Sequence, residues 1–327
     1  MQRGAGQRNS TVVRRMISQA FVLGAGLGLR LRPLTEDLPK PLVPIFQKPL
    51  ITFAIDHLIA AGVKSFVINT HHLPEHFDRF FEGGQYRDLP VRLAHEPVLL
   101  ETGGGIKNAQ PQLGSEPFIA YSGDVLTDLP LAPLIEEHFR SGNDVTLALR
   151  ETGLAANVAF REGRVVDIGN RYGHAGNFDY ANVAVWNPAI FERIPPNEKI
   201  SFIPIVADWI GAGGKIGGVI SQEGRWFNLG SRAEYLAVHR TIAEGWRPAY
   251  VCDPEWPRRI APDATIDPGA EVRGFSCIGA GCRVGADALI EDSILWLGAQ
   301  IASHSRLKNC IVRTHGRAEG DLEDAVV

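Results

Sequence analysis

From residue 260 to the end of the chain, aliphatic residues recur every six positions. They stand at Ile260, Ile266, Val272, Ile278, Val284 and Ile290, and the period then slips by one residue and resumes at Leu295, Ile301 and Leu307. A sustained six-residue period is typical of a parallel β-helix, in which each coil uses three repeats and turns its apolar corners inward. The repeat therefore predicts a β-helix of about three coils.

Upstream of this repeat, short apolar runs alternate with segments of helical spacing. Expected strands cover residues 19–23, 64–69, 91–95, 118–124 and 145–149, and expected helices cover residues 50–61, 74–81 and 129–140. Such alternation is typical of an α/β fold of the Rossmann-like type, with a mostly parallel sheet flanked by helices. Because 327 residues exceed the usual size of one domain, we predict an α/β domain at residues 18–250 and a β-helix domain at residues 251–327.

Two segments have the composition of chain outside a packed core. Residues 1–15 carry four arginines and no acidic residue, so we expect a disordered tail over residues 1–17, with Met16 as a candidate start. Asp253 and two nearby prolines indicate a linker between the domains. Trp256 and Trp296 are expected to be packed aromatics or anchors of a domain interface.

The charge and the cysteine content exclude several classes of function. A formal net charge of −4 argues against a nucleic-acid partner, because such proteins carry a basic surface. The four cysteines match no zinc motif, and no signal peptide or membrane-length apolar run precedes them. We therefore expect a reduced, cytoplasmic protein with no membrane partner.

Residues 21–44, FVLGAGLGLRLRPLTEDLPKPLVP, place glycines and cations directly after an apolar strand. The glycines are Gly24, Gly26 and Gly28. Glycine lets backbone N–H groups approach a ligand closely, so such a loop can hold a triphosphate. Arg30 follows the last glycine, and Lys40 lies between two prolines that restrict the backbone. Stiffly held cations suit phosphoryl chemistry, where positioning and charge neutralisation do most of the work.

The spacing does not fit the Walker A motif, which needs Gly-Lys-Ser/Thr. It does not fit the dinucleotide fingerprint either, because the third glycine of that motif is missing from its place. It resembles the signature of the sugar-1-phosphate nucleotidyltransferases, also called nucleotide-sugar pyrophosphorylases. The matching residues are Gly26-x-Gly28-x-Arg30-Leu31-x-Pro33-Leu34-Thr35, followed by Pro39-Lys40-Pro41-Leu42. The resemblance covers residues 20–245 and extends to mannose-1-phosphate guanylyltransferases and related uridylyltransferases with a C-terminal left-handed β-helix of hexapeptide repeats.

This resemblance implies that a nucleoside triphosphate and a sugar 1-phosphate condense to a nucleotide sugar and pyrophosphate. Arg30 would stabilise the leaving pyrophosphate, and Lys40 would neutralise both phosphates as they approach. Asp124, at the end of an expected strand, resembles the family's Gly-Asp ligand for Mg²⁺. Asn228 stands where the family has a second metal-binding aspartate, and its amide oxygen brings no charge.

A second glycine-rich segment, EPVLLETGGG at residues 96–105, follows a strand and places three glycines before an expected helix. It resembles the family loop Glu-x-x-Leu-Gly-Thr-Ala-Gly that holds the nucleobase, with Glu101 where glycine is usual. The implied nucleotide-binding residues are Glu96, Thr102, Gly103 and Gly104.

A carboxylate only accepts hydrogen bonds, which suits the adjacent N1–H and N2–H₂ donors of guanine better than a pyrimidine. We therefore expect Glu96 to face the base and GTP to be favoured. The alternative is a surface-exposed Glu96 with no base contact. The segment also resembles uridylyltransferases that act on amino-sugar phosphates, so the base stays open between guanylyl, uridylyl and thymidylyl transfer.

The sugar is less well determined. The family's Glu-Lys-Pro is not recognisable, and the resemblance leaves Arg171 and Asn182 as sugar-binding candidates. Asn182 stands where the family's Asn-Ala-Gly-Ile has its glycine. A mannose-like or heptose-like 1-phosphate is favoured by resemblance.

Two further hypotheses concern function outside catalysis. The departures at Asn228 and Glu-Lys-Pro motivate a non-catalytic paralogue that binds a nucleotide sugar and regulates a partner. A solenoid with exposed ends and flat faces tends to self-associate, so we expect a homo-oligomer through the β-helix. Hexapeptide repeats also occur in acyltransferases, for which His304 and His315 are the nominal candidates.

Overall fold

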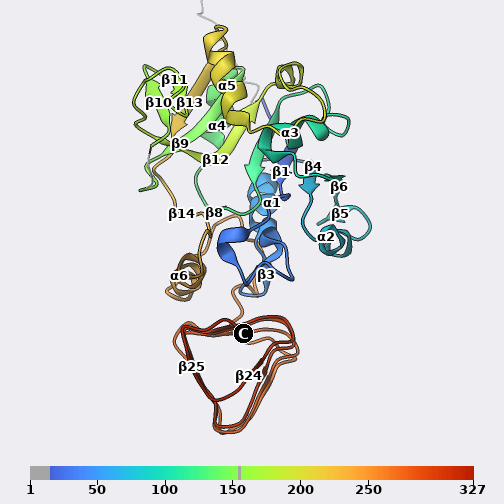
Figure 1. The fold of residues 1–327 in the computed structure, drawn as a ribbon, viewed down its shortest axis with the longest axis vertical. Helices are drawn as coiled ribbons and strands as arrows, with labels where there is room; N and C mark the ends of the chain where they lie inside the picture. Colours follow the sequence, from blue (N-terminus) through green and yellow to red (C-terminus); the bar gives the residue numbers. More distant parts are fainter. Residues whose placement is uncertain (1–14, 154–155) are drawn as a thin grey trace, which may run out of the picture.

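The computed structural model describes residues 15–153 and 156–327, and Figure 1 shows a helix-flanked body above a triangular coil. Most of the predicted tail lies outside the described residues. Ile17, inside the range predicted for the tail, is 2% exposed and packs in the core. The packed chain therefore begins at least one residue earlier than predicted.

One ten-stranded sheet, in the order β10-β11-β13-β9-β12-β7-β1-β4-β6-β5, forms the centre of the α/β domain. Its strands are β1 (Gln19–Leu23), β4 (Ser65–Thr70), β5 (Gln85–Tyr86), β6 (Leu89–His95), β7 (Phe118–Ser122), β9 (Val145–Arg150), β10 (Val158–Arg161), β11 (Arg164–Ile168), β12 (Asp179–Trp186) and β13 (Ile216–Ile220). The run from β7 through β1 and β4 to β6 is parallel, whereas β12 lies antiparallel to both β7 and β9. The predicted mostly parallel sheet is confirmed.

Helices cover both faces of this sheet, as predicted. They are α1 (Ile51–Ala60), α2 (Pro74–Phe80), α3 (Glu101–Asn108), α4 (Ala132–Ser141) and α5 (Phe202–Gly211), whereas α6 (Arg232–Ala243) packs in a third cluster away from the sheet faces. One core cluster joins the sheet to α3 and α5, and a second joins it to α1, α2 and α4. None of the helices in the described ranges has both the length and the apolar character needed to span a bilayer.

The C-terminal repeat folds into three parallel ladders, which confirms a parallel β-helix. The ladders are β15 (Thr265–Ile266), β18 (Arg283–Val284), β21 (Gln300–Ile301) and β24 (Arg317–Ala318); β16 (Glu271–Arg273), β19 (Leu289–Glu291), β22 (Arg306–Lys308) and β25 (Asp321–Glu323); and β17 (Cys277–Ile278), β20 (Ile294–Leu295) and β23 (Ile311–Val312). The predicted slip of one residue recurs in the next coil, between β22 and β23. Paired residues of neighbouring coils are therefore unevenly spaced in the sequence. Arg283 follows its partner Thr265 by one residue more than Gln300 follows Arg283.

A third core cluster joins the two domains. Cys277, Ile294 and Ile311, from the ladder β17-β20-β23, share it with Leu31 and Leu34 of the α/β domain. The outward side of this ladder is therefore an apolar face that the α/β domain covers. All four cysteines of the chain are free thiols.

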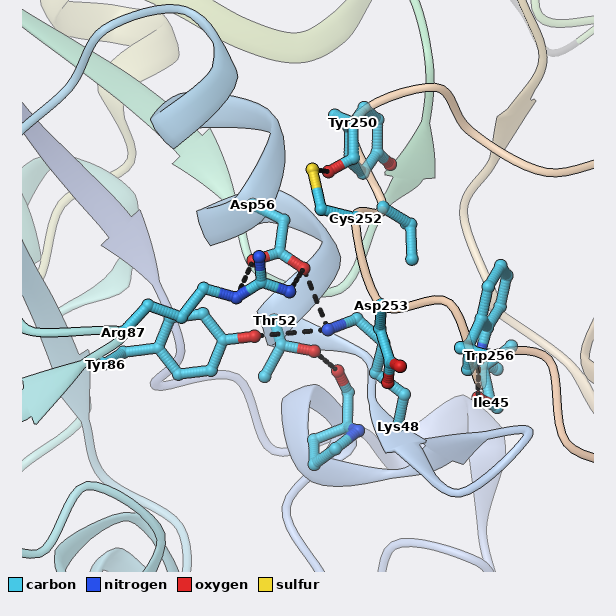
Figure 2. Close-up of polar contacts among 12 residues, drawn as sticks. Ile45, Lys48, Thr52, Asp56, Tyr86, Arg87, Tyr250, Cys252, Asp253 and Trp256 are labelled. Carbon is cyan, nitrogen blue, oxygen red and sulfur yellow. Dashed lines mark hydrogen bonds and ion pairs between the residues drawn. The ribbon is translucent and has the colours of Figure 1, made fainter.

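The linker residue Trp256 is an interface anchor, one of the two roles expected for it. Its Nε1 donates to the carbonyl of Ile45 at 3.1 Å, as Figure 2 shows. Ile45 belongs to a hairpin of β2 (Pro44–Ile45) and β3 (Lys48–Pro49). Under the hairpin, the buried carboxylate of Asp56 pairs with Lys48 at 2.8 Å and with Arg87 at 3.1 Å.

Candidate functional site

A cavity of about 580 Å³ opens at the carboxyl ends of β1, β4 and β7. Ligands of open α/β sheets bind at this edge, and the volume lies within the usual range for small-molecule sites. Residues from both glycine-rich segments line it, including Gly26, Gly28, Arg30, Lys40, Asn69, Leu99, Glu101, Thr102, Asp124, Ser201 and Gly230. The fold thus brings together segments that are far apart in the sequence.

Lys40 and Asp124, two of the three residues predicted to be catalytic, meet at the cavity. Lys40 opens the 3-10 helix η2 (Lys40–Leu42) directly after Pro39. Its Nζ lies 2.7 Å from Asp124 Oδ2 and 2.9 Å from the main-chain carbonyl oxygen of Asn228. The ammonium is thus largely buried and fixed by two acceptors, while a third of the Asp124 side chain stays exposed.

Arg30 reaches the cavity from the other end of the first segment, in the 3-10 helix η1 (Leu29–Leu31). Gly28 precedes it with φ 63°, a left-handed conformation that glycine adopts without strain. A Cβ on Gly230 would lie 3.3 Å from Arg30 Nη1, so glycine there leaves room for the guanidinium. Gly230 belongs to the segment after β14 (Trp226–Phe227), which pairs with β8 (Leu126–Thr127).

The three glycines of the first segment have different roles. Gly26 and Gly28 line the cavity, in agreement with a phosphate-binding loop. The prediction for Gly24 is wrong, because its N–H donates to Asn69 Oδ1 at 2.8 Å. A Cβ on Gly24 would lie 2.7 Å from the Asn69 carbonyl oxygen, so this glycine permits close packing of β1 on β4.

Glu96 neither faces the base nor lies on the surface, so both sequence-based alternatives are wrong. It has no exposed surface. Its Oε1 accepts from Asn69 Nδ2 at 2.7 Å, and its Oε2 accepts from the Leu100 N–H at 2.9 Å. Burial raises the pKa of the Glu96 carboxyl, although both donors oppose that shift.

Asn69 therefore links the two glycine-rich segments, and sequence reasoning assigned it no role. Its side-chain amide accepts from Gly24 and donates to Glu96, and Asn69 is among the residues that line the cavity. The signal that could have found it was its place at the carboxyl end of an expected strand, where polar side chains of α/β folds gather.

The prediction that glycines precede the helix after residue 100 is also wrong. Gly103 and Gly104 lie inside α3, and both N–H groups donate to the carbonyl of Ile200, at 2.8 and 3.0 Å. A Cβ on Gly104 would lie 2.3 Å from the Glu198 carbonyl oxygen. These glycines let α3 pack against the chain before α5, and their N–H groups are not free to bind a nucleotide.

Glu101 is the carboxylate of this segment that does line the cavity. Its φ is 60°, which explains why the resembling family has glycine at this position. Its Oε1 lies 3.9 Å from Lys199 Nζ, and nearly half of the side chain is exposed. Beside it, Thr102 lines the cavity as predicted, and its Oγ1 accepts from the Phe202 N–H at 3.0 Å.

The sugar-binding candidates lie outside the residues that line the cavity. Arg171 pairs with Asp208 on the surface at 3.2 Å, so the structure gives that prediction no support. Asn182 adopts φ 64° at an irregularity of β12, a conformation that asparagine tolerates and that explains the glycine of the family motif. Its role in sugar binding stays a prediction.

The metal prediction depends on one carboxylate. Within residues 15–153 and 156–327, no three His, Cys, Asp or Glu side chains come together as a metal site. Asp124 offers a partly exposed carboxylate inside the cavity, which suits Mg²⁺ held mainly by substrate phosphates. Asn228 contributes its main-chain oxygen to Lys40, which places this residue beside the same carboxylate.

The fold and the cavity define an α/β protein of the nucleotide-binding type, with Arg30, Lys40 and Asp124 on one cavity at the carboxyl edge of its sheet. Residues 19–244 match the nucleotidyl transferase family, and the chain belongs to that family. It is a sugar-1-phosphate nucleotidyltransferase, which confirms the enzyme class predicted from the sequence.

The chain is similar to proteins with several named activities. A mannose-1-phosphate guanylyltransferase of Mycobacterium tuberculosis is 28% identical over 86% of this chain and 80% of that protein. The D-glycero-alpha-D-manno-heptose 1-phosphate guanylyltransferase of Aneurinibacillus thermoaerophilus is 32% identical over 56% of this chain and 81% of that protein. The solved inositol-1-phosphate CTP transferase of T. maritima, with TM-score 0.56 and 21% identity over 72% of this chain and 99% of that chain, shares the fold.

Proposed function

We propose that the enzyme transfers a guanylyl group from GTP to a mannose-like or heptose-like sugar 1-phosphate. The observation that carries the choice of base is Glu101, a carboxylate on the cavity wall beside Thr102. Carboxylate oxygens accept from the adjacent N1–H and N2–H₂ donors of guanine, and we assign this contact to Glu101 because it lines the cavity while Glu96 is buried outside it. The guanylyltransferase relatives support the same base and this class of sugar.

In the proposed reaction, a phosphate oxygen of the sugar 1-phosphate attacks the α-phosphorus of GTP. The bond from that phosphorus to the bridging oxygen of the β-phosphate breaks, and pyrophosphate leaves. Lys40, held by Asp124 and Asn228, neutralises the two approaching phosphates, and Arg30 stabilises the leaving group.

We further propose Mg²⁺ as the cofactor, with Asp124 as its carboxylate ligand and Asn228 as a neutral neighbour. The ion would add positive charge to the triphosphate. An Asp124→Asn variant should weaken Mn²⁺ binding, followed by its electron paramagnetic resonance signal in the presence of GTP. Unchanged Mn²⁺ affinity in this variant would remove Asp124 from the proposal.

The base is tested with purified protein, five nucleoside triphosphates and a panel of sugar 1-phosphates, followed by pyrophosphate release. GTP should exceed UTP in kcat/KM by about 10²-fold, because UTP would leave a Glu101 acceptor without a donor once the bound base covers that carboxylate. Glu101→Gln should narrow that ratio about 10-fold by replacing one acceptor with a donor. Equal use of GTP and UTP, unaffected by Glu101→Gln, would contradict the choice of base.

Uridylyl transfer is the second candidate. The run Leu100-Glu101-Thr102-Gly103-Gly104-Gly105 resembles uridylyltransferases that act on amino-sugar phosphates, and a UTP–glucose-1-phosphate uridylyltransferase of Synechocystis is also similar, at 22% identity. A preference for UTP with an amino-sugar 1-phosphate in the same panel would select this candidate.

A cytoplasmic homo-oligomer remains part of the proposal. The apolar ladder face of the β-helix is covered by its own α/β domain, so self-association would use another face. The face of β16, β19, β22 and β25 carries charges of both signs, such as Arg273, Glu291 and Lys308. Light scattering at low and high salt would test this: a dimer that dissociates at high salt is expected, and a monomer at both would contradict it.

A further inference from the structure

The β-helix packs against the segment that carries the catalytic cations. Leu31 and Leu34, which flank the turn after Arg30, lie in one cluster with Cys277, Ile294 and Ile311 of the β-helix. The residues that the α/β domain contributes to this contact directly follow Gly28 in the sequence. The β-helix therefore packs on the same segment that carries Arg30.

Arg313 extends this contact with polar bonds. It follows β23, and its Nη1 donates to the carbonyl of Pro33 at 3.1 Å. The same atom lies 2.8 Å from Asp37 Oδ2 and 3.3 Å from Glu36 Oε2. About a quarter of the Arg313 side chain is exposed, so most of it is buried, whereas the Glu36 and Asp37 carboxylates stay largely exposed.

The held segment is connected to the cavity through short bonds. Thr35 Oγ1 donates to the carbonyl of Gly28 at 2.9 Å, and the Leu31 N–H donates to that same carbonyl at 2.9 Å. Gly28 lines the cavity and Arg30 projects from the turn between these bonds. A displacement at Pro33 would therefore move the turn that carries Arg30.

A second set of contacts reaches the segment after Lys40. Trp296 Nε1, in the β-helix, donates to the Tyr235 hydroxyl at 3.0 Å, and that hydroxyl donates to the carbonyl of Pro44. In the same hairpin, Gln47 Nε2 donates to the carbonyl of Ile278 at 3.1 Å. The β-helix is thus bonded to the chain between Arg30 and Lys40 and again after Lys40.

We propose that the β-helix is part of the scaffold of the active site and that Arg313 is a positioning residue for the turn carrying Arg30. The proposal rests on the nucleotidyltransferase activity for its kinetic consequence but not for its structural one. Arg313 acts through Pro33 and Gly28 and touches no reacting atom.

The experiment compares full-length Arg313→Ala with the wild type by hydrogen exchange and by kinetics. Without substrate, the amides of Leu31, Leu34 and Glu36, which close the turns of this segment, should exchange about 10-fold faster in the variant. In catalysis, kcat/KM for the triphosphate should fall about 10-fold, since a small displacement of a charged group is costly.

Two matched variants separate positioning from charge. Arg317→Ala removes an exposed arginine from β24 of the same domain and should change neither measurement. Arg313→Lys keeps the charge facing Asp37 but loses the forked guanidinium group. Compared with Arg313→Ala, it should restore part of the protection of these amides from exchange.

Unchanged exchange at residues 28–37 in a folded Arg313→Ala protein would overturn the proposal, whatever its activity. So would an equal effect of Arg317→Ala. If the wild type transfers no nucleotide to any sugar phosphate in the panel, the proposed function fails, while the exchange comparison still decides the role of Arg313.

Discussion

The two glycine-rich segments of the cavity, residues 24–44 and 96–105, have similar composition and use glycine in different ways. In the first, a Cβ added to Gly26 would meet nothing within 4 Å and Gly28 takes a left-handed turn, so the backbone itself faces the cavity. In the second segment, a Cβ on Gly104 would lie 2.3 Å from the Glu198 carbonyl oxygen. The glycines of this segment therefore allow neighbouring elements of the protein to pack closely. A glycine run after a strand thus indicates close approach, but not whether a ligand or the protein approaches.

The charged groups of the two segments differ in the same way. The first segment presents Lys40 and Arg30 to the cavity. Of the charged groups in the second segment, only Glu101 lines the cavity. Glu96 is buried, and its carboxylate accepts from Asn69 and from the Leu100 N–H. We therefore expect substitutions in the first segment to change kcat. Substitutions in the second segment should change the stability of the fold and the preference for one base over another.

The largest expected effect is that of Lys40→Ala. Loss of the fixed ammonium should lower kcat at least about 10²-fold, because it neutralises charge that develops in the transition state. Pyrophosphate release at saturating substrates measures this. The control is Lys64→Ala, an exposed lysine just before β4 at the opposite end of the sheet from the cavity, and unchanged turnover of Lys40→Ala would remove the assignment.

The next effect contrasts two glycines. Gly104→Ala should destabilise the fold by about 1–3 kcal/mol, because the steric overlap exceeds the helix-propensity gain of alanine, about 1 kcal/mol. Gly26→Ala should change stability by less than about 0.5 kcal/mol and act instead on KM for the triphosphate.

Calorimetric melting temperatures and triphosphate KM values of both variants measure this contrast. A melting temperature of Gly104→Ala equal to that of the wild type would mean that the second segment is as open as the first, and the comparison would fail.

Glu96→Gln tests whether the second segment reads the base through this residue. Glutamine offers one acceptor where Asn69 and Leu100 supply two donors, so stability should fall by about 1–3 kcal/mol. The ratio of kcat/KM for GTP and UTP should stay constant, in contrast to Glu101→Gln. A shifted ratio with unchanged stability would return the base contact to Glu96.

The smallest effect concerns a buried histidine that joins α1 to β7. The Nδ1 of His57 in α1 lies 3.2 Å from the hydroxyl of Tyr121 in β7, and burial lowers the pKa of His57 to about 4. An unfolded chain binds this proton near pH 6.5, so the stability contributed by neutral His57 is present above pH 6.5 and is lost as the pH falls toward 4.

His57→Gln should therefore have a melting temperature that changes less between pH 6.5 and 5 than that of the wild type. His239, whose pKa burial also lowers to about 4, stays in both proteins and serves as an internal control. Parallel curves for the two proteins would contradict the role of His57.

The sequence by itself determined the architecture and the first segment. The six-residue period, the strand–helix alternation and the spacing of Gly26, Gly28, Arg30 and Lys40 are local patterns, and local patterns constrain the backbone directly. The β-helix and the mostly parallel sheet were predictable from them, and so was the position of Asp124, because parallel strands end at one edge. The contact of Lys40 with Asp124 depends on tertiary packing, because Lys40 lies in η2 and not at the end of a strand.

Only the tertiary structure decided what Glu96, Asn69 and Arg313 do. Each acts on a segment 27 to 280 residues away, from Asn69–Glu96 to Arg313–Pro33, and no local pattern encodes such a partner. Glu96 became a buried acceptor because Asn69 and the Leu100 N–H face it, and that depends on the docking of one strand beside another. A carboxylate can accept from any donor near it, and only packing determines whether that donor belongs to the substrate or to the protein.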